Sequence, residues 1–202
     1  MFAAVLDTCV LWPSLQRDFL LSLAVENLYR PLWSERILEE LECHEALKLG
    51  SRGDDRQVAE TRAHKLIQRM ASAFDDAVVE RWQPYDGTFG LPDPDDEHVL
   101  AATVAGGAGA IVTSNVKDFP RNKVPEHIHV LGPAHFAADT VSVSPDAALR
   151  AVESLSRRFR QPPVDVEQVL TDLRTRYGMD EAVELIRNVD LSADGAARSG
   201  RY

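Results

Sequence analysis

Cysteine is scarce in this chain, and its scarcity excludes two kinds of stabilising site. The 202 residues include only two cysteines, Cys9 and Cys43. They lie far apart in sequence and have no Cys or His partners at the spacing of zinc ligands, so the sequence indicates neither a disulfide framework nor a structural zinc site. We expect both thiols to be reduced and to lie in the core.

Long apolar runs are absent as well. No stretch approaches the roughly 20 apolar residues that a membrane-spanning helix needs. The segment before Asp7 has no basic region and only five apolar residues after Met1, so we expect no signal peptide. An apolar content of 45% is enough to build a buried core. These features predict a folded, cytoplasmic protein without membrane attachment.

Basic residues are too few for a general electrostatic binder of nucleic acid. The formal net charge is −10, which would repel a phosphate backbone from most of the surface. Residues 1–140 carry most of the excess, with 13 basic and 22 acidic side chains. Concentrated carboxylates can serve an anionic substrate once bound cations neutralise them, so the charge is compatible with a metal site as well as with an ordinary solubilising surface.

Short apolar runs alternate with helical patterns along the first part of the chain. Strands are expected at residues 2–6, 78–82, 110–113 and 128–131, and helices at 11–28, 34–49, 54–74 and 95–105. This alternation predicts an α/β domain, residues 1–140, with a parallel sheet flanked by helices. Helical patterns at 144–159, 164–177 and 180–189 then predict a helical C-terminal extension, residues 141–202.

Several acids follow predicted strands or begin predicted helices. In an open parallel sheet, ligands bind beyond the carboxyl ends of the strands, which selects Asp7, Asp93, Asp96 and Asp118. Glu40 would reach this edge only if its helix leans across it. Hard oxygen ligands without paired histidines favour Mg²⁺ or Mn²⁺ over zinc, and such ions promote phosphodiester hydrolysis.

Polar neighbours of these acids have two open interpretations. The hydroxyl and amide groups of Thr8, Thr113 and Asn115 are candidate substrate contacts, although they could equally form hydrogen bonds within turns. Asp95 and Glu97 are expected at the surface.

Four segments, taken in order, resemble the motifs of the PIN domain family. They are VLDTCV from Val5, SERILEEL from Ser34, LPDPDDEHVLAA from Leu91 and IVTSNVKDFP from Ile111. The resemblance implies a Rossmann-like fold in which Asp7, Glu40 and Asp96 are metal ligands and Asp93 contributes. The fourth motif departs from the commoner pattern because Asn115 stands where many relatives carry Asp, and Asp118 is the candidate to replace it in catalysis.

The resemblance also implies a biological role. Many bacterial members are VapC-type toxins, which are ribonucleases held inactive by a cognate antitoxin, and a subset carries a C-terminal extension. By this resemblance we expect a Mg²⁺- or Mn²⁺-dependent endoribonuclease with an RNA substrate, an antitoxin partner and a homodimeric state. The open alternative is a catalytically weak PIN-fold protein that acts by binding RNA or protein.

Two other enzyme classes fit the residues poorly. A Rossmann cofactor enzyme would need a Gly-rich phosphate turn where this chain has Asp7-Thr8-Cys9. A phosphatase with an aspartyl nucleophile would need a second acid two residues after Asp7, where Cys9 stands.

Overall fold

The computed structural model describes residues 2–199, with side chains described for residues 2–189. The chain forms two compact units that are interleaved along the sequence. One unit contains Phe2–Pro13 and Arg30–Gly132, and the other contains Ser14–Tyr29 and the chain from Pro133 onward. The predicted division at residue 140 stays a prediction.

A four-stranded parallel sheet forms the centre of the first unit. Its strands are β1 (Ala3–Leu6), β2 (Arg30–Leu32), β3 (Ala110–Val112) and β4 (His129–Leu131), in the order β2-β1-β3-β4. All three pairings are parallel. The apolar run at the start of the chain fits the central position of β1, where Ala4, Val5 and Leu6 are fully buried. The predicted α/β class is confirmed.

The strand predicted at residues 78–82 is wrong. Val78 makes only an isolated bridge to Trp33, and the strand in this part of the sheet is β2, which contains Pro31. Proline lacks a backbone N–H, so the sequence at residues 30–32 favours a turn. Pro31 is tolerated because β2 is an edge strand with β1 as its single partner in the sheet.

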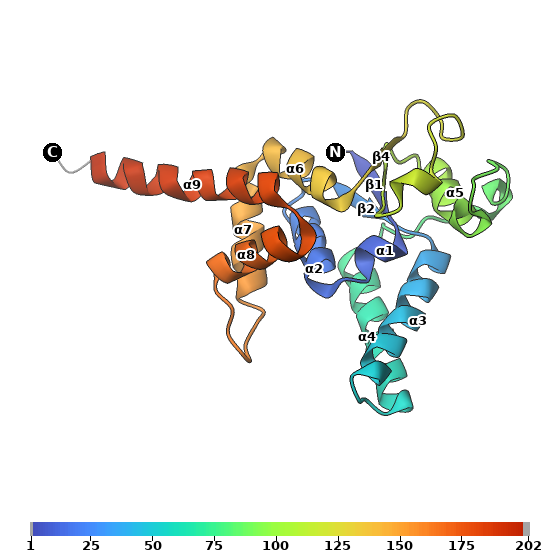
Figure 1. Ribbon diagram of the computed structural model, residues 1–202, viewed down its shortest axis with the longest axis horizontal. Helices are drawn as coiled ribbons and strands as arrows, with labels where there is room; N and C mark the ends of the chain where they lie inside the picture. Colours follow the sequence, from blue (N-terminus) through green and yellow to red (C-terminus); the bar gives the residue numbers. More distant parts are fainter. Residues whose placement is uncertain (1, 200–202) are drawn as a thin grey trace. The chain divides into compact units, whose positions relative to one another are not determined.

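The helices of this unit are α1 (Thr8–Leu11), α3 (Glu35–Ser51), α4 (Arg56–Ala73) and α5 (Glu97–Ala105). Three short 3₁₀ helices accompany them: η1 (Gln83–Tyr85) and η2 (Pro94–Asp96) lie between α4 and α5, and η3 (Val116–Asp118) follows β3. The Ser34 hydroxyl accepts the Ile37 N–H, at 3.2 Å, and so begins α3 as an N-cap. Helices α3 and α4 pack together as a hairpin (Figure 1), while α5 packs on β1 and β3.

The regular secondary structure described in the second unit is helical. It consists of α2 (Ser14–Val25), α6 (Pro133–Val143), α7 (Pro145–Ser156), α8 (Val166–Tyr177) and α9 (Asp180–Ser199). Helix α2 packs on α7, and α6 packs on α9. Helix α2 comes from the N-terminal part of the chain, whereas the other four helices follow residue 132. The Tyr29 ring meets Phe136 edge-on at 4.8 Å, and its hydroxyl donates to the Leu20 carbonyl. Among the described residues, no helix combines the length and apolar character needed to cross a bilayer.

Close packing at the end of α5 gives the first prediction. A Cβ at Gly106 would lie 2.8 Å from Cγ2 of Val79 and 3.1 Å from Cδ1 of Leu32. We expect Gly106→Ala to lower the free energy of unfolding by about 1–3 kcal/mol, because the packed side chains must shift. Gly109→Ala is the matched control, since a Cβ there meets nothing within 4 Å. Equal urea-unfolding midpoints for the two variants would contradict this explanation.

Candidate functional site

Four aspartates gather at the carboxyl edge of the sheet. Asp7 directly follows β1, and its backbone N–H donates to the Val112 carbonyl of β3 at 3.0 Å. Asp93 is the N-cap residue of η2, and Asp96 is the last residue of that helix. Asp118 is the last residue of η3. Burial, followed by the charges of the other three aspartates, raises the pKa of Asp96 to about 6. The four carboxylates are therefore near enough for their charges to interact.

The Asp7 carboxylate is buried and held through one of its oxygens. Its exposed fraction is 5%. Oδ2 accepts hydrogen bonds from the Thr113 hydroxyl at 2.7 Å and from the Cys9 thiol at 3.0 Å. Thr113 is fully buried, and its hydroxyl oxygen also accepts the Asn115 N–H at 3.0 Å. The geometry therefore gives Thr113 a role through Asp7, and direct contact of Thr113 or Asn115 with substrate stays a prediction.

The two cysteines lie in different surroundings, and neither is in the core as expected. Cys43 is exposed on α3, whereas Cys9 is half-buried beside Asp7. Burial, together with the Asp7 charge, raises the pKa of the Cys9 thiol to about 11. The thiol is therefore protonated at neutral pH and acts as a hydrogen-bond donor. Each cysteine is placed by the helix face that carries it, which an isolated Cys in the sequence does not reveal.

Glu40 lies in a network of its own. Its Oε2 accepts the Thr8 hydroxyl at 2.8 Å, while Oε1 lies 3.1 Å from Nε2 of His98 and 3.3 Å from Nε of Arg36. Burial opposes ionisation, but the contacts with His98, Thr8 and Arg36 prevail and lower the pKa of Glu40 to about 2. Glu40 is thus ionised at neutral pH and accepts a hydrogen bond from Thr8, the residue that directly follows Asp7. Its membership of a metal site stays a prediction.

Glu97 is buried rather than at the surface, contrary to expectation. Its side chain is 3% exposed and accepts the Phe89 N–H at 3.0 Å and the Leu91 N–H at 2.6 Å. It therefore fixes the loop that leads into Asp93. A glutamate within an acidic run is usually solvated, and nothing in the sequence shows that this one meets two backbone donors eight and six residues earlier.

The sequence comparisons agree with this arrangement. The family model for the PIN domain matches residues 3–117, more than half of the chain. The chain belongs to the PIN domain family. A second family model, the VapC50 C-terminal domain, matches residues 133–188. Together they confirm a VapC-type PIN protein with a C-terminal extension, and at family level they indicate a VapC-like nuclease toxin. Neither the curated proteins nor the solved structures gave a match.

The aspartates of the PIN domain fit a hard divalent cation by their chemistry. Carboxylate oxygens are the ligands that Mg²⁺ and Mn²⁺ prefer. Burial and then the charges of the neighbouring aspartates raise the pKa of Asp96, and a bound cation would relieve the repulsion among these acids. Among the described side chains, no three His, Cys, Asp or Glu residues are already arranged as a metal site.

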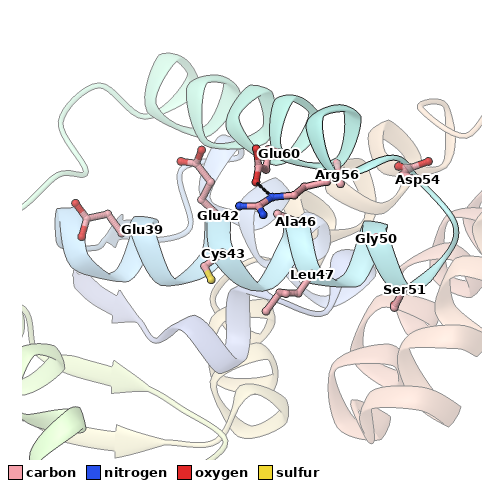
Figure 2. Close-up of a pocket in the computed structure, with 11 residues that line it drawn as sticks. Glu39, Glu42, Cys43, Ala46, Leu47, Gly50, Ser51, Asp54, Arg56 and Glu60 are labelled. Atoms are coloured by element: carbon pink, nitrogen blue, oxygen red, sulfur yellow. Dashed lines mark hydrogen bonds and ion pairs between the residues drawn. The ribbon is translucent and has the colours of Figure 1, made fainter.

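A separate hollow lies on the α3–α4 hairpin of the PIN domain (Figure 2). It has a volume of about 790 Å³, and Cys43, Ala46 and Leu47 form part of its apolar lining. Four acids also line it: Glu39, Glu42, Asp54 and Glu60. None of the four aspartates of the candidate site is among its lining residues. Glu39 faces this hollow while its neighbour Glu40 contacts Thr8, so adjacent acids serve different surfaces.

Proposed function

We propose that this PIN protein is a divalent-metal-dependent endoribonuclease and the toxin of a type II toxin–antitoxin system. The observation that carries the proposal is the placement of four aspartates in a PIN domain: Asp7 follows β1, Asp93 and Asp96 flank the start and end of η2, and Asp118 ends η3. A site that concentrates repelling acids is suited to bind cations and, through them, an anionic substrate.

In the proposed mechanism, Asp7, Asp93, Asp96 and Asp118 would hold Mg²⁺ or Mn²⁺. When bound, the ion supplies an activated water and stabilises negative charge at the reacting phosphate. Thr113 keeps the Asp7 carboxylate in place, and Glu97 holds the loop before Asp93. These supporting contacts preorganise the acids, which is the main contribution a protein makes to phosphoryl chemistry.

Glu40 remains in the proposed catalytic and ligand set. Its lowered pKa keeps it ionised, and its contacts with Thr8 and His98 hold it beside the segments that carry Asp7 and Asp96. Thr8 is assigned here to positioning Glu40, as Thr113 is to positioning Asp7. Asn115 remains the candidate polar contact to an RNA phosphate, because its exposed amide can donate hydrogen bonds.

The alternative is a catalytically weak PIN protein that acts by binding. Asn115 favours it, because an amide cannot replace the charge of the acid that many relatives carry there. The four aspartates at the sheet edge favour the enzyme instead, since a binding protein has no need to keep mutually repelling acids near one another. We further propose a cytoplasmic location, a homodimer and a cognate antitoxin.

Growth of a bacterial host tests the toxin assignment. Induced expression of the wild-type chain is expected to stop growth, and Asp7→Asn at equal abundance is expected to leave growth unchanged, because the variant lacks one ligand charge. Co-expression of a small protein encoded beside the gene is expected to restore growth. Equal arrest by Asp7→Asn would support the binding alternative, and wild-type expression without arrest would remove the toxin role.

A further inference from the structure

We propose that Cys9 is a positioning residue of the candidate metal site, whose thiol acts with Thr113 to leave only Oδ1 of Asp7 for the ion. This inference rests on the proposed metal-dependent function. It concerns the way in which one ligand is presented, and no motif of the sequence assigns that role to Cys9.

The hydrogen bonds to Asp7 fall on one oxygen. Oδ2 receives the Thr113 hydroxyl at 2.7 Å and the Cys9 thiol at 3.0 Å. A carboxylate oxygen has two lone pairs in its plane, so these two donors occupy Oδ2. Among the described residues, none donates a hydrogen bond to Oδ1. Asp7 would therefore bind an ion through a single oxygen.

Cys9 also connects the two segments that frame the site. Its sulfur accepts the Ser114 N–H at 3.2 Å, while its thiol donates to Asp7. Thr113 and Ser114 both follow β3, whereas Asp7 and Cys9 follow β1. Two adjacent links, Thr113 to Asp7 and Ser114 to Cys9, thus hold these segments together and restrict rotation of the Asp7 carboxylate.

The Cys9 sulfur is itself a poor candidate for a metal ligand. Mg²⁺ and Mn²⁺ prefer oxygen, and Sγ already takes part in hydrogen bonds to the Asp7 carboxylate and the Ser114 backbone. Its effect should come through the carboxylate it orients. Loss of a residue that supports a metal ligand costs about 10–100-fold in metal affinity, and a thiol is a weak donor, so we expect the lower end of this range.

Calorimetric titration of the full-length protein with Mn²⁺ tests the inference. We expect Cys9→Ala to bind Mn²⁺ about 10-fold more weakly than wild type, and Cys9→Ser to recover most of the loss because its hydroxyl can also donate. Cys43→Ser is the matched control, since it changes the other cysteine, exposed on α3, and should bind as wild type does. In RNA cleavage, Cys9→Ala should raise the Mn²⁺ concentration for half-maximal rate and leave the KM for RNA unchanged.

The outcomes separate the inference from the proposed function. Wild-type Mn²⁺ affinity in Cys9→Ala would overturn the positioning role, and so would Cys9→Ser binding as weakly as Cys9→Ala. Absence of Mn²⁺ binding by the wild-type protein would instead contradict the proposed metal-dependent function itself.

Discussion

Asp96→Asn is expected to lower RNA cleavage about 1,000-fold, because losing a metal ligand removes several kcal/mol of transition-state stabilisation. The same change should make the metal-free protein more stable at neutral pH. The pKa of Asp96 is about 6, compared with an ordinary value of 3.8, so the folded state holds the proton more tightly than the unfolded chain. A variant that loses activity while gaining stability would identify the residue as functional.

The stability gain should depend on pH in a defined direction. The favourable contribution of protonated Asp96 is complete below pH 3.8 and is lost as the pH rises through about 6. Asparagine carries no charge, so Asp96→Asn should gain about 1 kcal/mol at pH 7, a value reduced because the carboxyl is partly solvated. Urea unfolding in EDTA at pH 4 and pH 7 measures this difference. Asp95→Asn, whose side chain is 92% exposed, is the control, and an equal gain in that variant would contradict the account.

Glu97→Ala is expected to lower the free energy of unfolding by about 2–5 kcal/mol. The substitution leaves the N–H groups of Phe89 and Leu91 without the carboxylate that accepts them, and each unsatisfied buried donor costs about 1–3 kcal/mol. Cleavage should fall as well, because the loop before Asp93 loses its anchor. Thermal unfolding and RNA cleavage measure the two effects.

Two further variants make the Glu97 prediction specific. Glu97→Gln should retain much of the stability, since its amide oxygen still accepts a hydrogen bond. Asp95→Ala should have little effect, because that side chain is largely exposed. A loss in Glu97→Ala no larger than that in Asp95→Ala would show that the loop is held by other contacts.

The parallel sheet and the four PIN motifs could be predicted from the sequence, because both depend on patterns of neighbouring residues. An apolar run such as residues 2–6 favours a strand of a parallel sheet, and parallel strands bring their carboxyl ends to one edge. That rule alone selected Asp7, Asp93, Asp96 and Asp118, and in the structure the charges of the other three contribute, after burial, to the raised pKa of Asp96.

Other features could not be predicted because they depend on contacts distant in sequence. Pro31 argues against a strand unless the strand is known to lie at an edge, and Val78 resembles a strand residue but makes only one bridge. Helix α2 packs with α7 in the helical unit, although it lies directly after the first PIN motif. The support of Asp7 by Thr113 joins residues separated by 106 positions.

Cleavage of total bacterial RNA by the purified protein tests the central claim most directly. Wild type and Asp7→Asn, prepared identically and compared for folding by circular dichroism, would be incubated with Mg²⁺, with Mn²⁺ and with EDTA. The account predicts discrete RNA fragments with either ion, none in EDTA and none from Asp7→Asn. Cleavage that persists in EDTA or in Asp7→Asn, or no cleavage by the wild type under any condition, would contradict it.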